Sequence, residues 1–108
     1  MSKANTTENE TLDAILRGVD PSWRGNASRY IALHTADPGD AGSAVTSEAT
    51  FTNYARQTVT AATGFTAGSG GSSGNTAQIA FPECGVTGNT ITHVSIVTTT
   101  SGAGQILY

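Results

Sequence analysis

Residues 89–99, "NTITHVSIVTT", alternate between two sets of side chains with a period of two. That period belongs to an extended strand, because successive side chains of a strand point to opposite faces of a sheet. A segment of this kind commits the chain to a sheet-based fold. Its two predicted faces are Ile91, His93, Ser95 and Val97 on one side, and Thr90, Thr92, Val94, Ile96 and Thr98 on the other.

Other segments follow the same pattern and are separated by turn residues. Charged residues make up only 12% of the chain, and Thr, Ser, Gly and Ala take their place, as in strands joined by turns. Strands are expected at 30–35, at 51–61 (one strand or two short ones), around Phe65, at 77–81 and at 105–108, with a flexible hairpin tip or linker at 68–75. One helix followed by roughly six such strands predicts a mainly β fold: a small antiparallel β-sandwich or barrel with one N-terminal α-helix.

The helix is predicted at residues 7–17. Thr7 and Glu10 have the spacing of a capping box, and Gly18 followed by Pro21 marks the end of the helix. We expect residues 1–6 to form a flexible arm and residues 7–108 to form a single β-sandwich domain. The helix carries one apolar stripe, which we expect to pack on the sheet: Leu12, Ile15, Leu16 and Val19.

Charge and hydropathy exclude several kinds of partner. The net charge is −3 and the five basic residues are scattered, so no nucleic-acid footprint is expected. No apolar run approaches the roughly 20 residues of a membrane helix, so no membrane partner is expected. Cys84 is the only cysteine and is expected to be a small buried residue. The basic residues are Lys3, Arg17, Arg24, Arg29 and Arg56.

The sequence contains a match to a hydrolase motif. Residues 70–74 match G-x-S-x-G around Ser72, and Glu83 and His93 follow in the order acid, base. The motif requires a strand–turn–helix elbow in a large parallel sheet, whereas here it lies in a Gly/Ser-rich run where chance matches are common. The same run lacks the Lys of a phosphate loop. We therefore expect no catalytic residue and no cofactor.

A metal site is the other chemical possibility. His34, Asp37, Asp40 and His93 offer zinc ligands, but no two histidines have the close spacing of a metal site. Asp37 and Asp40 are ordinary turn residues beside Pro38. We expect no bound metal.

Partner contacts are predicted at the two ends of the chain and after the helix. Trp23 and Arg24 are residue types enriched at interface hot spots, although Trp23 could instead pack the helix onto the sheet. Lys3 lies in the arm, and an exposed last strand often pairs with another chain. The predicted contact residues are Lys3, Trp23, Arg24, Gln105, Leu107 and Tyr108.

Five blocks in order resemble a group of small tailed-bacteriophage virion proteins. After a short N-terminal helix, the blocks are a YxALHTADP strand and turn in "RYIALHTADPGDAG", YARQ in "NYARQTVT", FP in "NTAQIAFPEC", and ThxxI and then GxxLY in "ITHVSIVTTTSGAGQILY". Members of this group are described as tail-fibre-like or minor structural proteins, and some as head decoration. The resemblance implies no catalytic residues, and it implies that "HTADPG" is a structural strand-to-turn element. In relatives the last strand often continues beyond "LY", so a partner could complete it here.

These observations predict a bacteriophage virion structural protein, assembled in the host bacterial cytoplasm. The favoured role is a capsid decoration (cement) protein that binds the outside of the major capsid protein shell and copies of itself. The alternative is a tail component such as a tail fibre adaptor. A small hydrolase using Ser72 and His93 is a third hypothesis. A carbohydrate-binding module is a fourth, disfavoured by an aromatic content of only 6%.

Overall fold

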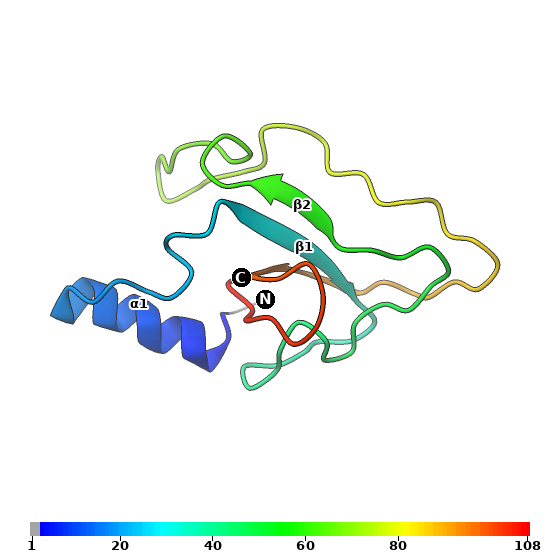
Figure 1. Cartoon of the computed structure of the whole chain (residues 1–108), viewed down its shortest axis with the longest axis horizontal. Helices are drawn as coiled ribbons and strands as arrows, with labels where there is room; N and C mark the ends of the chain where they lie inside the picture. The colour runs from blue at the N-terminus through cyan, green and yellow to red at the C-terminus, as the bar shows by residue number, and fades with distance from the viewer. Residues whose placement is uncertain (1–2) are drawn as a thin grey trace.

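A computed structural model describes residues 3–108. In this part of the chain there is one helix, α1 (Asn5–Arg17), and one antiparallel sheet of three strands: β1 (Ser28–His34), β2 (Gln57–Thr60) and β3 (His93–Val97). The strand order is β2-β1-β3, so β1 is central, and α1 extends to one side of the sheet (Figure 1). The mainly β fold class with one N-terminal helix is confirmed.

The hydrophobic core lies on one face of the sheet. Strand β1 pairs with β3 so that Tyr30 is opposite Val97 and Ala32 is opposite Ser95. These side chains share one face because alternate residues of a strand point the same way. The face is covered by segments from both ends of the chain and from the loop after β1. The buried cluster is Ala4, Ala32, Ala44, Val97 and Ile106.

The last predicted strand lies against β3 of the same chain. Val97 and Ile106 form an antiparallel bridge, the Ile96 amide donates to the Tyr108 carbonyl at 2.8 Å, and the Leu107 amide donates to the Ile96 carbonyl at 2.7 Å. Residues 105–108, the C-terminal segment, therefore cover the outer edge of β3. No second chain is needed to pair with that part of the edge.

Several predicted strands are shorter than expected or are replaced by loops. In 51–61 only Gln57–Thr60 pairs with β1, because the chain turns before it: Asn53 has a φ of 75° and the Tyr54 amide donates to the Phe51 carbonyl. Phe65 forms only an isolated bridge with Asn75. Residues 77–81 pass β2 on the side away from β1 (Figure 1), but they form no named strand.

Helix α1 begins two residues earlier than predicted. Ala4 is its N-cap residue and makes no side-chain capping bond, so the predicted capping box is absent. The Asn5 amide instead donates to the Asp40 carbonyl at 2.8 Å. Gly18 ends the helix in the left-handed conformation, with a φ of 65°, as predicted. Residues 1 and 2 of the predicted arm lie outside the described residues, whereas Ala4 is buried in the core.

Candidate interaction surfaces

Helix α1 is attached to the rest of the molecule through polar side chains. The buried Thr7 hydroxyl donates to the Ile106 carbonyl at 2.5 Å, and Gln105 Nε2 donates to Thr7 Oγ1 at 2.7 Å. Gln105 Nε2 also donates to Glu10 Oε2 at 2.8 Å, while the Ser22 amide donates to Glu10 Oε1 at 3.2 Å. The hydrogen bonds from Ser22 and then Gln105 lower the pKa of Glu10. The polar side of the helix therefore faces inward.

The apolar side of α1 faces solvent, which corrects the prediction that it packs on the sheet. Residues of a helix are about 100° apart around its axis, so the positions of Thr7 and Glu10 are roughly opposite that of Leu12. The C-terminal segment presents an amide and a carbonyl to the helix, and these polar groups select the polar side. The exposed residues, here called the outer stripe, are Leu12 (54% exposed), Ile15 (72%), Leu16 (76%) and Val19 (46%).

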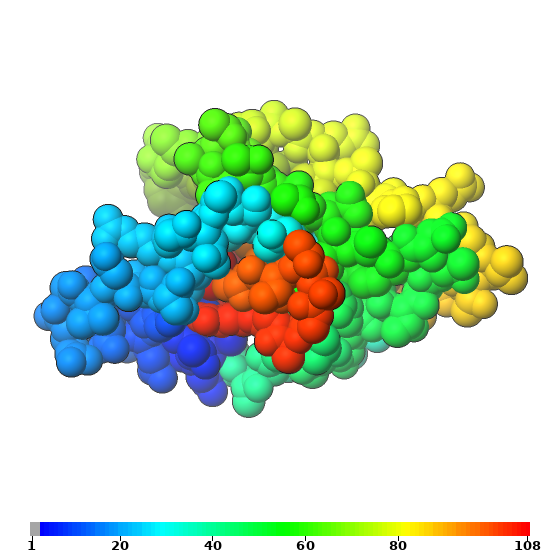
Figure 2. All heavy atoms as spheres, in the orientation of Figure 1, coloured from blue at the N-terminus to red at the C-terminus, as the bar shows by residue number. Residues whose placement is uncertain are grey.

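The outer stripe lies at one end of an elongated molecule. The principal extents are 49 × 29 × 24 Å, and the blue helix forms one end of the space-filling view (Figure 2). Large apolar side chains grouped on one side of α1 and just beyond its end, and exposed to this degree, are typical of an interaction site rather than of scattered surface residues.

A second apolar surface lies on the face of the sheet opposite the core. Ile31, Val94 and Ile96 alternate with the core residues and point to this other face. Together with residues of the 65–79 loop and the C-terminal residue they line a groove of about 650 Å³. Val94 is 55% exposed and Tyr108 is 59% exposed, so solvent reaches the groove. The side chains that define this sheet groove are Ile31, Phe65, Ile79, Val94, Ile96 and Tyr108.

Two basic residues lie near the sheet groove. Arg29 lines an adjoining hollow that shares Phe65, Ile96 and Tyr108 with the groove. The Lys3 ammonium is 5.4 Å from the centre of the Tyr108 ring, within cation–π range. The groove is therefore apolar inside and has positive charge beside it.

The predicted contact residues fall into two places. Lys3 and the C-terminal segment residues Gln105, Leu107 and Tyr108 come together where the two ends of the chain meet. Trp23 and Arg24 lie in the loop after α1. Trp23 is half-buried, with the Arg29 guanidinium 5.9 Å from its ring centre, and Arg24 pairs with Asp20.

The residues that sequence reasoning missed are those whose exposure depends on packing. The pattern predicts that the outer stripe is apolar and buried, whereas these side chains are exposed. Val94 and Ile96 were placed on the face opposite Val97 by the alternation, yet nothing in the pattern says that this face carries a groove.

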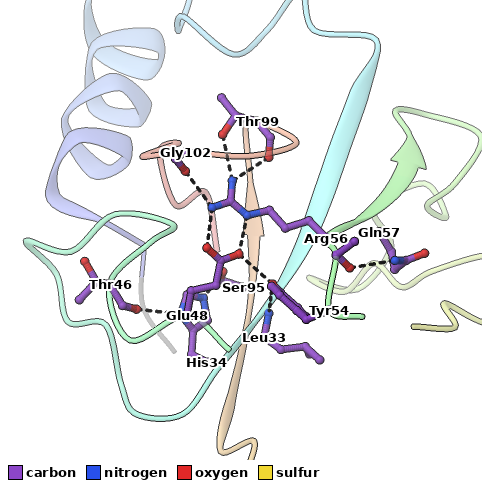
Figure 3. Close-up of polar contacts among 11 residues, drawn as sticks. Leu33, His34, Thr46, Glu48, Tyr54, Arg56, Gln57, Ser95, Thr99 and Gly102 are labelled. Atoms are coloured by element: carbon purple, nitrogen blue, oxygen red, sulfur yellow. Dashed lines mark hydrogen bonds and ion pairs between the residues drawn. The ribbon is translucent and has the colours of Figure 1, made fainter. Parts of the chain in front are cut away.

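A buried ion pair holds the loops beside the sheet together (Figure 3). Arg56 Nε donates to Glu48 Oε1 at 2.6 Å and Nη2 donates to Oε2 at 2.8 Å, a bidentate pair. The remaining N–H groups of Arg56 donate to the carbonyl and hydroxyl of Thr99 and to the Gly102 carbonyl. All five guanidinium donors are thus used, and the Arg56 side chain is only 2% exposed.

The contacts around the ion pair shift the pKa values of Glu48, Arg56 and the neighbouring Tyr54. Burial alone would raise the pKa of Glu48, but hydrogen bonds from Arg56 and Tyr54 outweigh it and hold that pKa below its usual value. The hydrogen bond to Glu48 raises the pKa of Arg56. Burial and the neighbouring Glu48 carboxylate raise the pKa of Tyr54 to about 12. The pair is therefore ionised and Tyr54 is neutral near pH 7.

His34 is buried, and both of its ring nitrogens are hydrogen-bonded within the chain. Its Nδ1 is 2.9 Å from the Thr46 carbonyl, which can only accept, so Nδ1 carries the hydrogen. In the neutral ring Nε2 then accepts from the Ser95 hydroxyl at 2.7 Å. Both residues are buried, so this serine–histidine pair is closed to a substrate. Both ring nitrogens are occupied, which leaves neither for a metal.

The other candidate chemical groups are not assembled into a site. Asp37 Oδ1 accepts from the Gly39 amide in a local turn, and no group of three or more potential metal ligands occurs within residues 3–108. Ser72 pairs with Ser69 in a tight turn, whereas His93 Nδ1 is 2.8 Å from Thr92 Oγ1. Cys84 is exposed, contrary to the prediction, because it lies in a surface loop.

The family model described as "Podophage GP4 fiber I protein gp80" matches residues 2–108. The chain belongs to this family. A gp80-family chain is a bacteriophage virion structural protein, which confirms the coarser part of the resemblance and the virion location. No curated protein matches the chain.

In this gp80-family chain the "HTADPG" block does form a strand end and a turn. His34 ends β1, and the Gly42 amide donates to the Gly39 carbonyl within the following turn. The same loop supplies the Asp40 carbonyl that accepts from the first turn of α1. Of the residues that the structure describes, no helix has both the length and the apolar character to span a bilayer.

Proposed function

We propose that this chain is a structural component of a podophage tail fibre, joined to other tail proteins of the virion. The observation that carries the proposal is the match of a fibre-protein family to residues 2–108. Two exposed apolar surfaces, the outer stripe and the sheet groove, support an assembly role, because such patches mark sites of protein contact.

The tail position has more support than the capsid position favoured by the sequence. The family description names a fibre protein, whereas nothing in it refers to the capsid shell or to decoration. The proposed partners are accordingly tail proteins and further copies of the chain. The proposed role is structural, with no catalytic step, and assembly takes place in the host bacterial cytoplasm.

Counting and locating the protein in purified particles tests the proposal. Mass spectrometry against the major capsid protein should find only a few copies per particle, and antibody labelling in electron micrographs should mark the tail. One copy per capsid subunit with label over the head would establish decoration instead. Absence from washed particles would reject a virion role.

A further inference from the structure

We propose that the outer stripe of one copy docks in the sheet groove of a second copy. The stripe has the positions that a groove-bound helix uses as anchors, i, i+3 and i+4, at Leu12, Ile15 and Leu16, and the exposed Val19 follows just after the helix ends. Within the described residues, each chain thus presents an unpaired apolar helix face and an apolar groove. This inference stands on the two surfaces alone and does not require the fibre assignment.

Charge favours the sheet groove of the second copy, rather than its helix α1, as the surface that contacts the outer stripe. Helix α1 and the loop that follows it, residues 5–24, carry four acidic and two basic residues, so two copies of α1 side by side bring surfaces of like net charge together. The sheet groove instead has Arg29 and Lys3 beside it. An acidic helix next to a groove with basic neighbours is electrostatically complementary, and such complementarity selects the partner and its orientation.

The two surfaces differ, so the contact is head-to-tail. Joining a patch on one copy to a different patch on the next leaves one stripe and one groove free at the ends of every open assembly. Such an arrangement either closes into a ring or continues as a filament. A symmetric dimer through α1 would use the stripe alone and leave the groove without a role.

Acidic substitutions on the two surfaces test the contact with the purified full chain. Leu16→Glu disables the stripe and Val94→Glu disables the groove, and both positions are more than half exposed, so the fold should be retained. Val86→Glu is the matched control, because Val86 is 98% exposed and lies in a loop that lines neither surface. Circular dichroism and the unfolding temperature verify that all three variants fold.

Sedimentation as a function of concentration gives the readout. The wild-type chain and Val86→Glu should self-associate, and each of the other variants should weaken association by at least about tenfold, which corresponds to about 1.4 kcal/mol. An equal mixture of Leu16→Glu and Val94→Glu should form a heterodimer and stop there, because only one intact stripe and one intact groove can meet.

Three results would overturn the proposal. The wild-type chain could remain monomeric at every concentration tested. Val94→Glu could associate like the wild type while Leu16→Glu does not, which would assign the stripe to another occupant. The mixture could fail to form the heterodimer. None of these results depends on where the protein lies in the particle, so they are distinguishable from a failure of the proposed tail position.

Discussion

Arg56 and Glu48 form a buried bidentate ion pair, with Nε 2.6 Å from Oε1 and Nη2 2.8 Å from Oε2. The pair joins the loop after β1 to the turn before the C-terminal segment, because Arg56 also bonds the carbonyls of Thr99 and Gly102. Every buried charge here has a partner, which is the condition under which a buried ion pair is tolerated.

Removing one member of this pair should be strongly destabilising. We expect Arg56→Met to lower the free energy of unfolding by about 3–5 kcal/mol, because Glu48 is left as an uncompensated, largely buried charge. Arg24→Met is the control, since Arg24 pairs with Asp20 at the surface and should change stability by less than about 1 kcal/mol. Urea denaturation measures both. Equal effects of the two substitutions would contradict the buried pair.

The same pair predicts a loss of stability in acid. The pKa of Glu48 is lower in the folded chain than the ordinary value of 4.5, so its contribution is present above pH 4.5 and is lost as the pH falls through the folded pKa. Glu48→Gln should remove this part of the pH dependence. Unfolding temperatures measured across the acid range for both proteins check it. Parallel curves for the two would rule out Glu48 as the source.

Tyr54 should ionise late in alkali. Its pKa of about 12 lies above the ordinary value of 10.0, so the folded chain keeps the phenol proton that the unfolded chain loses. The stabilisation is present below pH 10 and is lost as the pH rises through about 12. Ultraviolet absorbance titration of the phenols, compared with Tyr54→Phe, should assign the last component to Tyr54. A variant that retains this component would disprove the assignment.

The outward orientation of α1 predicts two opposite results for similar substitutions. Leu16→Ala should change stability by less than about 0.5 kcal/mol, because Leu16 is 76% exposed. Ile106→Ala should cost about 2–5 kcal/mol, because Ile106 is 1% exposed within the core. Denaturant unfolding at a concentration where the chain is monomeric measures both. A large cost at Leu16 would mean that the stripe packs against the sheet.

The sequence predicted secondary structure best where the segment with the pattern also has a neighbouring strand to pair with. The alternation of 89–99 correctly placed Ser95 and Val97 on one face and Val94 and Ile96 on the other, and Gly18 correctly marked the end of α1. The alternation of 77–81 was equally regular, yet those residues form no named strand. Alternation describes side chains, whereas a strand also needs a neighbour for its backbone amides and carbonyls.

The orientation of α1 could not be predicted from its pattern. The spacing of Leu12, Ile15 and Leu16 shows that they share a face, but it does not say whether that face points in or out. The answer depends on Thr7, which bonds the Ile106 carbonyl 99 positions away instead of capping its own helix. A capping box is a local motif, and a distant partner that is better placed can replace it.

The candidate site was predicted only in part for the same reason. The positions of Lys3 and Tyr108 near the chain ends predict a role in contacts, and the structure brings the two residues together. The ion pair of Glu48 and Arg56 had no recognisable spacing, since one residue lies in a loop and the other precedes β2. Its only sequence signal is a lone arginine inside a strand-like segment.

In most amphipathic helices the apolar side attaches the helix to its own chain. In α1 the polar side does this, and the outer stripe is left for contact with a neighbour. Thr7 and Glu10 hold the helix in place, whereas Leu16 and its neighbours take no part in holding it. Substitutions on the outer side are therefore nearly free of folding constraint. A chain built in this way can acquire a different neighbour by changing a few surface side chains, while the sheet, the core and the ion pair stay as they are.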